Sequence, residues 1–166
     1  MSTQADYTAR ILSYVQGKDP IAVQRQTPEQ IAQLMEGKPN DMLVTRPGPE
    51  RWSVAELLGH LADSEICASW RYRQMIEHSG GSLSAYDQEL WNVLGNNSSR
   101  NSAESLQLFR LLRAQNVGML ERLSDEQWQR YGIHAERGQM SVRDLAQQLA
   151  GHDLNHVEQI RNILTK

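Results

Sequence analysis

At 166 residues, the chain has the length of one domain that can bury a single hydrophobic core without disulfides. Its 17 basic and 20 acidic residues give a net charge of −3 with no basic block, which argues against a nucleic-acid partner and against binding to an anionic membrane surface. Only one cysteine, Cys67, is present, and no apolar run has the length of a signal peptide or a membrane span, so we expect a cytoplasmic protein without internal disulfides.

Helical signals begin near the N-terminus. Apolar residues at helical spacing predict a first helix over about residues 6–15, and Gly17 follows as a stop signal. Thr27 followed by Pro28 is typical of an N-cap and a first helical residue, which predicts a short helix ending near Gly37. We expect residues 38–51, with their three prolines, to form a loop within the domain.

A long helix is predicted after this loop. The residues 53–56 form a capping box, and an apolar face continues from there towards residue 78. Glu56 and His60 lie near one line on the helix surface, and that line continues through Cys67 and Arg71. We therefore expect His60 to border the buried face.

The segment 79–101 is rich in Gly, Ser and Asn, apart from one or two helical turns at 86–91. Long ordered loops over a helical scaffold often form pocket walls or lids, and we expect such a role here. Asn101 caps the next helix, whose apolar seam includes the polar Asn116. We expect Arg113, its neighbour, to extend to the surface.

The rest of the chain is predicted to contain a short turn, a loop and a last helix. Ser124 caps a short turn, a loop over Gly132–Met140 contains His134, and Ser141 starts the last helix. No alternation typical of strands persists anywhere.

Two histidines four residues apart interrupt the apolar stripe of this last helix. His152 and His156 share one helix face with aliphatic residues, and buried imidazoles need hydrogen-bond partners or a metal. From the residues alone, satisfied core histidines and metal ligands are about equally plausible. If the two long helices pack side by side, His60 can join the pair, and three imidazoles with one open position are typical of a catalytic zinc-type site.

Five segments of the chain together resemble the DinB superfamily, the DinB/YfiT-like proteins. They are Arg51–Glu65, Tyr86–Trp91, Leu112–Asn116, His134–Gly138 and Gly151–Ile160. The resemblance implies an all-α four-helix bundle spanning residues 1–166 as one domain, which is often a homodimer. It also implies a divalent-metal site, and His60, His152 and His156 all match the family's histidine triad.

The resemblance also implies a chemistry. Some members of the family transfer low-molecular-weight thiols, such as bacillithiol or mycothiol, to electrophiles. Three neutral imidazoles would leave the charge of a zinc or nickel ion uncompensated, which favours a thiolate or a hydroxide at the open position. Our first prediction is therefore a metal-dependent thiol S-transferase with a small-molecule substrate. The alternatives are a hydrolase that uses metal-activated water and a non-catalytic stress-response protein with a structural or adventitious metal.

Two observations can separate these alternatives. A hydrolase normally has a base near the open position, for which Asp63 is the best candidate, so its absence from the site would count against hydrolysis. A fourth protein ligand would indicate a structural metal.

Other residues could support the site. Arg71 is a candidate for binding a carboxylate of the thiol, although a surface ion pair is the simpler interpretation, and Asn116 could face the cavity. Glu56, Asp63 and Asp153 could accept hydrogen bonds from the imidazoles, although surface carboxylates are more common. We expect Cys67 to be a small core or pocket residue and His78 to be solvated, and we assign His134 no role.

Overall fold

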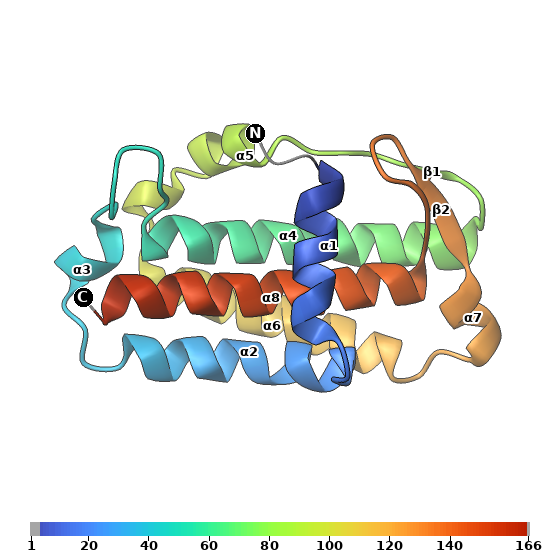
Figure 1. The fold of residues 1–166 in the computed structure, drawn as a ribbon, viewed down its shortest axis with the longest axis horizontal. Helices are drawn as coiled ribbons and strands as arrows, with labels where there is room; N and C mark the ends of the chain where they lie inside the picture. Colours follow the sequence, from blue (N-terminus) through green and yellow to red (C-terminus); the bar gives the residue numbers. More distant parts are fainter. Residues whose placement is uncertain (1–3, 166) are drawn as a thin grey trace.

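Four long helices form the body of the protein. The computed structural model describes residues 4–165. The four helices are α2 (Pro20–Met35), α4 (Val54–Glu77), α6 (Ser102–Leu120) and α8 (Val142–Leu164). Helices α2 and α4 each pack against both α6 and α8, which closes a four-membered bundle (Figure 1). The predicted four-helix bundle is confirmed.

Local capping signals start three of these helices where the sequence places them. The Ser53 and Glu56 side chains form a reciprocal capping box at the start of α4, and Ser141 with Asp144 does the same for α8. Asn101 Oδ1 accepts the backbone N–H of Ala103 at 2.9 Å and so caps α6. These contacts span only two or three residues, which is why the sequence predicts them well.

Helix α2 begins earlier than predicted. Asp19 Oδ1 accepts the backbone N–H of Ile21 at 2.9 Å, and Pro20 is the first helical residue. The predicted start at Thr27 is wrong, because two similar cap-and-proline signals stand eight residues apart and the helix uses the first.

Pro28 therefore lies inside α2 and leaves one carbonyl without its helical donor. A proline has no N–H, so the carbonyl oxygen of Gln24, four residues earlier, cannot form the usual helical bond. That oxygen instead accepts a hydrogen bond from Arg113 Nη1 of α6 at 2.8 Å. The proline thus creates an acceptor for a neighbouring helix.

Short helices connect and cover the bundle. Helix α1 (Gln4–Val15) crosses over α8, and the predicted first helix is confirmed (Figure 1). A short helix that we did not predict, α3 (Asn40–Val44), lies in the segment expected to be a loop. The remaining pieces are α5 (Gln88–Leu94), the 3₁₀ turn η1 (Asn97–Ser99) and α7 (Asp125–Gln129).

A small sheet lies at the end of the bundle where α4 ends and α8 begins (Figure 1). Its strands are β1 (Ser82–Leu83), β2 (Tyr131–His134) and β3 (Gly138–Ser141), in that order. Strand β1 runs parallel to β2 with Ser82 opposite Ile133, and β2 pairs antiparallel with β3 with Tyr131 opposite Ser141. The predicted loop over Gly132–Met140 is wrong, because strands this short carry no readable alternation.

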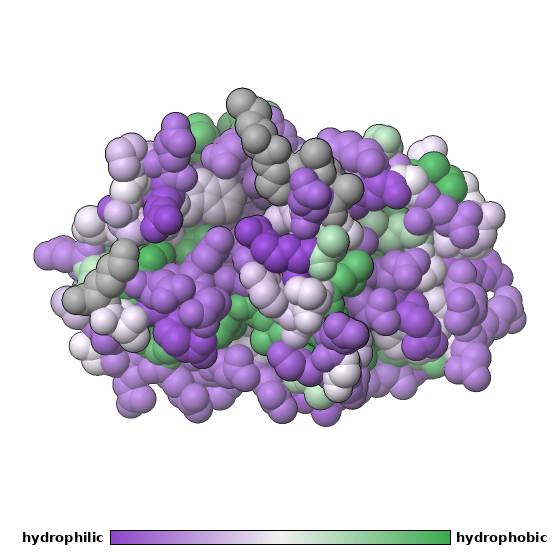
Figure 2. Space-filling view, viewed as in Figure 1, coloured by the Kyte–Doolittle hydropathy of each residue, from purple (hydrophilic) through white to green (hydrophobic). Residues whose placement is uncertain are grey.

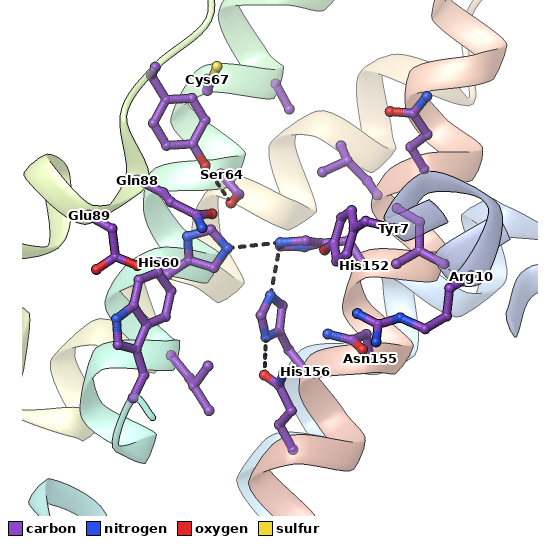
Figure 3. A pocket seen from close by; sticks show the side chains of 18 of the residues that line it. Tyr7, Arg10, His60, Ser64, Cys67, Gln88, Glu89, His152, Asn155 and His156 are labelled. Atoms are coloured by element: carbon purple, nitrogen blue, oxygen red, sulfur yellow. Dashed lines mark hydrogen bonds between the residues drawn. The ribbon is translucent and has the colours of Figure 1, made fainter. Parts of the chain in front are cut away.

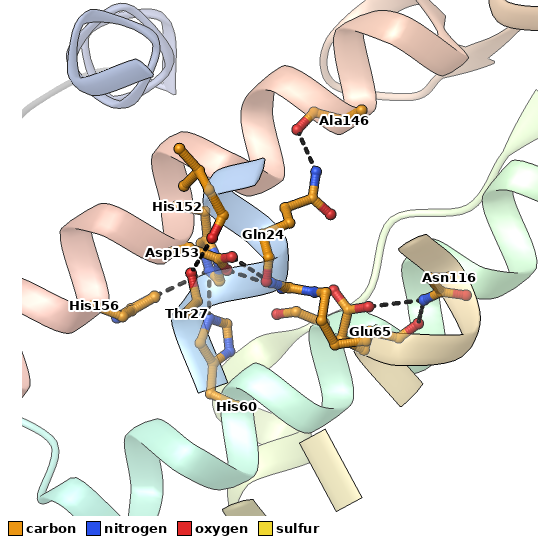
Figure 4. A network of polar contacts seen from close by, with 12 residues as sticks. Gln24, Thr27, His60, Glu65, Asn116, Ala146, His152, Asp153 and His156 are labelled. Atoms are coloured by element: carbon orange, nitrogen blue, oxygen red, sulfur yellow. Dashed lines mark hydrogen bonds and ion pairs between the residues drawn. The ribbon is translucent and has the colours of Figure 1, made fainter. Parts of the chain in front are cut away.

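A polar layer divides the hydrophobic core in two. One cluster of buried apolar side chains contains Leu57 and Phe109, and a second contains Met75 and Leu145. Between them Arg113, only 2% exposed, forms ion pairs with Glu65 and Asp153 (Figure 4). The prediction that Arg113 extends to the surface is wrong, because two carboxylates from α4 and α8 meet it inside.

Hydrophilic residues cover most of the face that carries α1, and hydrophobic ones show in the hollows at either side of that helix (Figure 2). Within residues 4–165, none of the helices combines the length and the apolar character needed to cross a membrane.

Candidate metal centre

A cavity of about 740 Å³ lies between α4, α8 and the segments that cover them. Among the α4 residues that line it, four stand at helical intervals of three or four, so they form one stripe. These are His60, Ser64, Cys67 and Arg71. The segment before α5 contributes Tyr86, whose hydroxyl lies 3.1 Å from Ser64 Oγ (Figure 3). The predicted role of residues 79–101 as a pocket wall is confirmed.

The three predicted histidines meet in this cavity. Nε2 of His152 lies 2.9 Å from Nε2 of His60 and 3.0 Å from Nε2 of His156 (Figure 3). Helix α4 supplies one ring, and the four-residue step on α8 stacks the other two on one face. All three rings therefore direct their Nε2 atoms to one point.

Neighbouring side chains hold two of the rings in place. His156 Nδ1 lies 2.7 Å from Gln159 Oε1, one turn further along α8. Because a carbonyl oxygen only accepts, the proton belongs on Nδ1, and Nε2 keeps its lone pair. The His60 ring packs against Trp52 with 5.0 Å between centroids. His152 Nδ1 is buried with no hydrogen-bond partner.

Burial keeps the three imidazoles neutral. Desolvation lowers the pKa of His60 and His152 well below 6.5, and the other histidines of the cluster lower it further. Desolvation also lowers the pKa of His156, to about 4, against a smaller opposing effect of the Gln159 hydrogen bond. At neutral pH the Nε2 atoms can thus offer lone pairs.

This donor set fits a divalent transition metal. Zinc–nitrogen bonds of about 2.0–2.1 Å place tetrahedral ligand nitrogens about 3.3 Å apart, close to the separations of 2.9 and 3.0 Å found here. Lone pairs that converge this closely repel unless a proton or a cation lies between them. Among residues 4–165, no further histidine, cysteine or carboxylate joins the three histidines, so the arrangement lacks the fourth protein ligand expected of a structural site.

Asp63 does not take part in this arrangement. It is absent from the cavity lining, and its Oδ2 lies 3.4 Å from Asn97 Nδ2. Three residues on a helix turn the side chain by about 60° from His60, which directs Asp63 towards η1 instead of the cavity. The structure therefore does not support Asp63 as the base, nor as a hydrogen-bond partner of an imidazole.

The other two candidate carboxylates serve the scaffold. Glu56 is buried and bonded to Arg46, which together with Ser53 and Asn92 lowers its pKa to about 2 although burial opposes this. Asp153 is buried and paired with Arg113. Neither carboxylate accepts a hydrogen bond from an imidazole of the histidine cluster, and neither lies on the surface.

The remaining predicted residues divide between the cavity and the core. Arg71 and Cys67 line the cavity. Asn116 instead donates to Glu65 Oε2 at 2.8 Å in the polar layer and does not line the cavity. His78 ends α4 with an exposed side chain, as expected. His134 is buried and lines the cavity.

Three polar cavity residues that the sequence analysis did not name matter for the site. Gln159 follows His156 by three residues on a helix, so its spacing could have indicated a partner. Glu89 of α5 and Arg137 of the β2–β3 turn also line the cavity. Glu89 belongs to the segment expected to form a pocket wall but was not singled out there, and the position of Arg137 depends on the pairing of β2 with β3.

Comparisons with known proteins agree with this fold. The model of the DinB superfamily matches residues 25–160. "Putative metal-dependent hydrolase YfiT" of Bacillus subtilis is 24% identical over 144 residues, which is 86% of this chain and 81% of the relative. "Putative metal-dependent hydrolase OB0413" of Oceanobacillus iheyensis is 25% identical over 114 residues, which is 69% of this chain and 65% of the relative.

A solved structure has the same fold. It is that of YfiT from Bacillus subtilis, described as "a probable metal-dependent hydrolase with an unusual four-helix bundle topology". It superposes with a TM-score of 0.81 at 22% identity, and the match covers 87% of this chain and 83% of the other.

Proposed function

The chain belongs to the DinB superfamily, and on that basis we propose that it is a metal-dependent hydrolase whose metal is bound by His60, His152 and His156. The observation that best supports this proposal is the convergence of three neutral Nε2 atoms in the wall of a large cavity. Two relatives are named "putative metal-dependent hydrolase", and these names favour hydrolysis over thiol transfer.

The chain's own residues would prepare the site. Gln159 Oε1 accepts a hydrogen bond from Nδ1–H of His156, so that the lone pair of Nε2 faces the metal position. Trp52 fixes the plane of the His60 ring. A divalent ion bound there supplies Lewis acidity, which lowers the pKa of water and polarises the oxygen of a carbonyl or phosphoryl group.

Glu89 is the carboxylate that we assign as general base. It lines the cavity, and Figure 3 shows it on the His60 side. Asp63, the base predicted from the sequence, faces Asn97 instead, which counts against hydrolysis by the criterion stated above, so the proposal depends on Glu89. Glu89 would accept the proton of the attacking water while the histidines hold the metal.

The test is a panel of chromogenic esters, amides and phosphate esters, assayed with zinc- or nickel-loaded protein. We expect turnover that disappears with His156→Ala and falls by about 10²–10⁴-fold with Glu89→Gln, as for loss of a general base. His78→Ala, which changes an exposed histidine outside the cavity, serves as the control. Turnover that survives His156→Ala would contradict the proposal.

Thiol transfer, the first prediction from the sequence, is the second candidate. The observation in its favour is the cavity volume of about 740 Å³, which can hold a small thiol together with an electrophile. Consumption of an electrophile that requires both the metal and an added low-molecular-weight thiol would favour it over hydrolysis.

A further inference from the structure

The end of the cavity remote from the histidines contains a buried arginine that has no carboxylate partner. Arg71 is 7% exposed, and its Nη2 donates to the carbonyl oxygen of Ser84 at 2.6 Å. Its Nε is buried with no partner at all. None of the ion pairs between described residues includes Arg71. A guanidinium buried in this way is expected to have an anionic partner.

His134 does not supply the anionic partner that Arg71 lacks. Its Nε2 lies 3.1 Å from Arg71 Nη2, and its Nδ1 lies 3.2 Å from the backbone N–H of Glu136. Burial, Arg71 and Arg137 all lower the pKa of His134, so the ring is neutral and has one lone-pair nitrogen. It can accept from only one of the two donors that face it.

A second arginine lies on the same wall. Arg137, at the tip of the β2–β3 turn, donates to Gln148 Oε1 at 2.9 Å and also forms no ion pair with a described residue. Burial and the charge of Arg71 lower the pKa of Arg137. Glu136 is the nearby carboxylate that opposes this effect, and it lies beyond ion-pair distance of both arginines. Two positive charges therefore share one wall.

The cavity lining contains both arginines and glutamates, and two of its arginines influence each other. The charge of Arg71 lowers the pKa of Arg137, and neither of them forms an ion pair with the carboxylates of the lining, Glu50, Glu89 and Glu136. An anionic ligand would therefore orient with its charge towards the arginines. The planar fork of a guanidinium matches carboxylate and phosphate oxygens.

We infer that Arg71 and Arg137 form an oxyanion-binding subsite, so that the substrate carries a carboxylate or phosphate group remote from the bond that reacts. This inference rests on the proposed function for the position of the reacting bond. Arg71 follows His60 by eleven residues on α4, a rise of about 16 Å, and helical side chains lean back towards the N-terminus. Because this lean applies to both side chains, the anionic group and the reacting bond are separated by on the order of 15 Å.

The test measures anion binding without metal. Chelator-treated protein, with and without His156→Ala, is titrated with inorganic phosphate or with acetate, and the Nε–H signals of the arginines are followed by NMR. We expect the Arg71 and Arg137 signals to shift and saturate, and the ion with the higher affinity identifies the chemical group. Arg137→Gln should weaken binding about tenfold, as for loss of a charged hydrogen bond.

Arg110→Gln is the matched control, because it removes the same charge from an exposed residue outside the cavity. Equal binding in the Arg137 and Arg110 variants, or an Arg71 signal that does not move, would overturn the inference. Binding that depends on Arg137 supports it, even if wild-type protein holds no metal; in that case the proposed function fails and the subsite stands. Metal-dependent turnover with no such anion binding would support the proposed function and overturn the subsite.

Discussion

The three histidines show how burial determines the chemistry of a single residue type. An exposed imidazole titrates near pH 6.5, but desolvation lowers the pKa of each member of this cluster. The lowered pKa keeps each ring neutral at neutral pH, so one nitrogen of each ring can offer a lone pair, and the Gln159 contact assigns the proton of His156 to Nδ1. A metal ligand needs both properties.

This burial makes the metal-free protein sensitive to acid. Below about pH 6.5 the unfolded chain protonates these histidines, whereas the folded protein does not do so until about pH 4 at His156. The free energy of unfolding should therefore fall as the pH drops from 6.5 towards 4, by about 1.4 kcal/mol per pH unit for each proton taken up. Urea denaturation with a chelator present measures this slope.

Because carboxylates such as Glu56 also contribute to the slope, the informative quantity is the difference between variants. His156→Ala should reduce the slope by up to about 1.4 kcal/mol per pH unit, the contribution of one proton. An unchanged slope would mean that His156 titrates normally in the folded protein.

At the scale of elements, the crossing of α1 over α8 depends on one glycine. A Cβ at position 151 would lie 2.1 Å from the carbonyl oxygen of Ile11, a contact that only a shift of the backbone can relieve. This glycine directly precedes His152, and α1 brings Tyr7 and Arg10 to the cavity (Figure 3). The close approach thus lets α1 cover the site.

Gly151→Ala should therefore destabilise the fold by about 1–3 kcal/mol, as other overpacked contacts do, despite the better helix propensity of alanine. Gly118→Ala is the control, since its nearest neighbour is the flexible Arg122 side chain at 3.6 Å. That variant should be neutral or up to about 1 kcal/mol more stable. Urea denaturation of both compares them, and equal stability would argue against the close crossing.

The elements also show what local sequence can predict. Ser53, Asn101 and Ser141 mark helix starts through contacts within three residues, so those starts were predicted correctly. Thr27 misled the prediction because an equivalent signal precedes it at Asp19. The strands were missed because their pairing, such as Ser82 with Ile133, is not local.

At the scale of the whole molecule, one buried layer links all four bundle helices. Arg113 of α6 bonds to Gln24 O of α2, to Glu65 of α4 and to Asp153 of α8 (Figure 4). The two carboxylates raise the pKa of Arg113, which stays charged although burial opposes this. Because Asp153 directly follows His152, the layer also fixes the position of the α8 histidines along the axis of the bundle.

Arg113→Met should cost about 3–5 kcal/mol, because it leaves Glu65 and Asp153 buried without a counterion. Arg110 lies on the same helix as Arg113 and forms an exposed ion pair with Glu29 of α2. Arg110→Met, which removes that pair, should cost about 0–1 kcal/mol. Denaturation midpoints of the two variants test this difference. Similar midpoints would mean that the layer contributes little to stability.

The candidate site was predictable only in part. The triad followed from the four-residue spacing of His152 and His156 together with the family resemblance, and the structure brings His60 to them. The residues around it were not predictable, because they depend on which helix faces meet. Asp63 and Asn116 face away from the cavity, whereas Glu89 reaches it from the short helix α5 and Arg137 from the β2–β3 turn.

The most direct test of the account is the metal content of protein purified without an affinity tag, measured by elemental analysis. We predict close to one equivalent of a divalent transition metal in the wild type and in His78→Ala, and its loss in His156→Ala. Absence of metal from the wild type, even after reconstitution with zinc or nickel, would contradict the account, because the three histidines would then be core or binding residues without a metal.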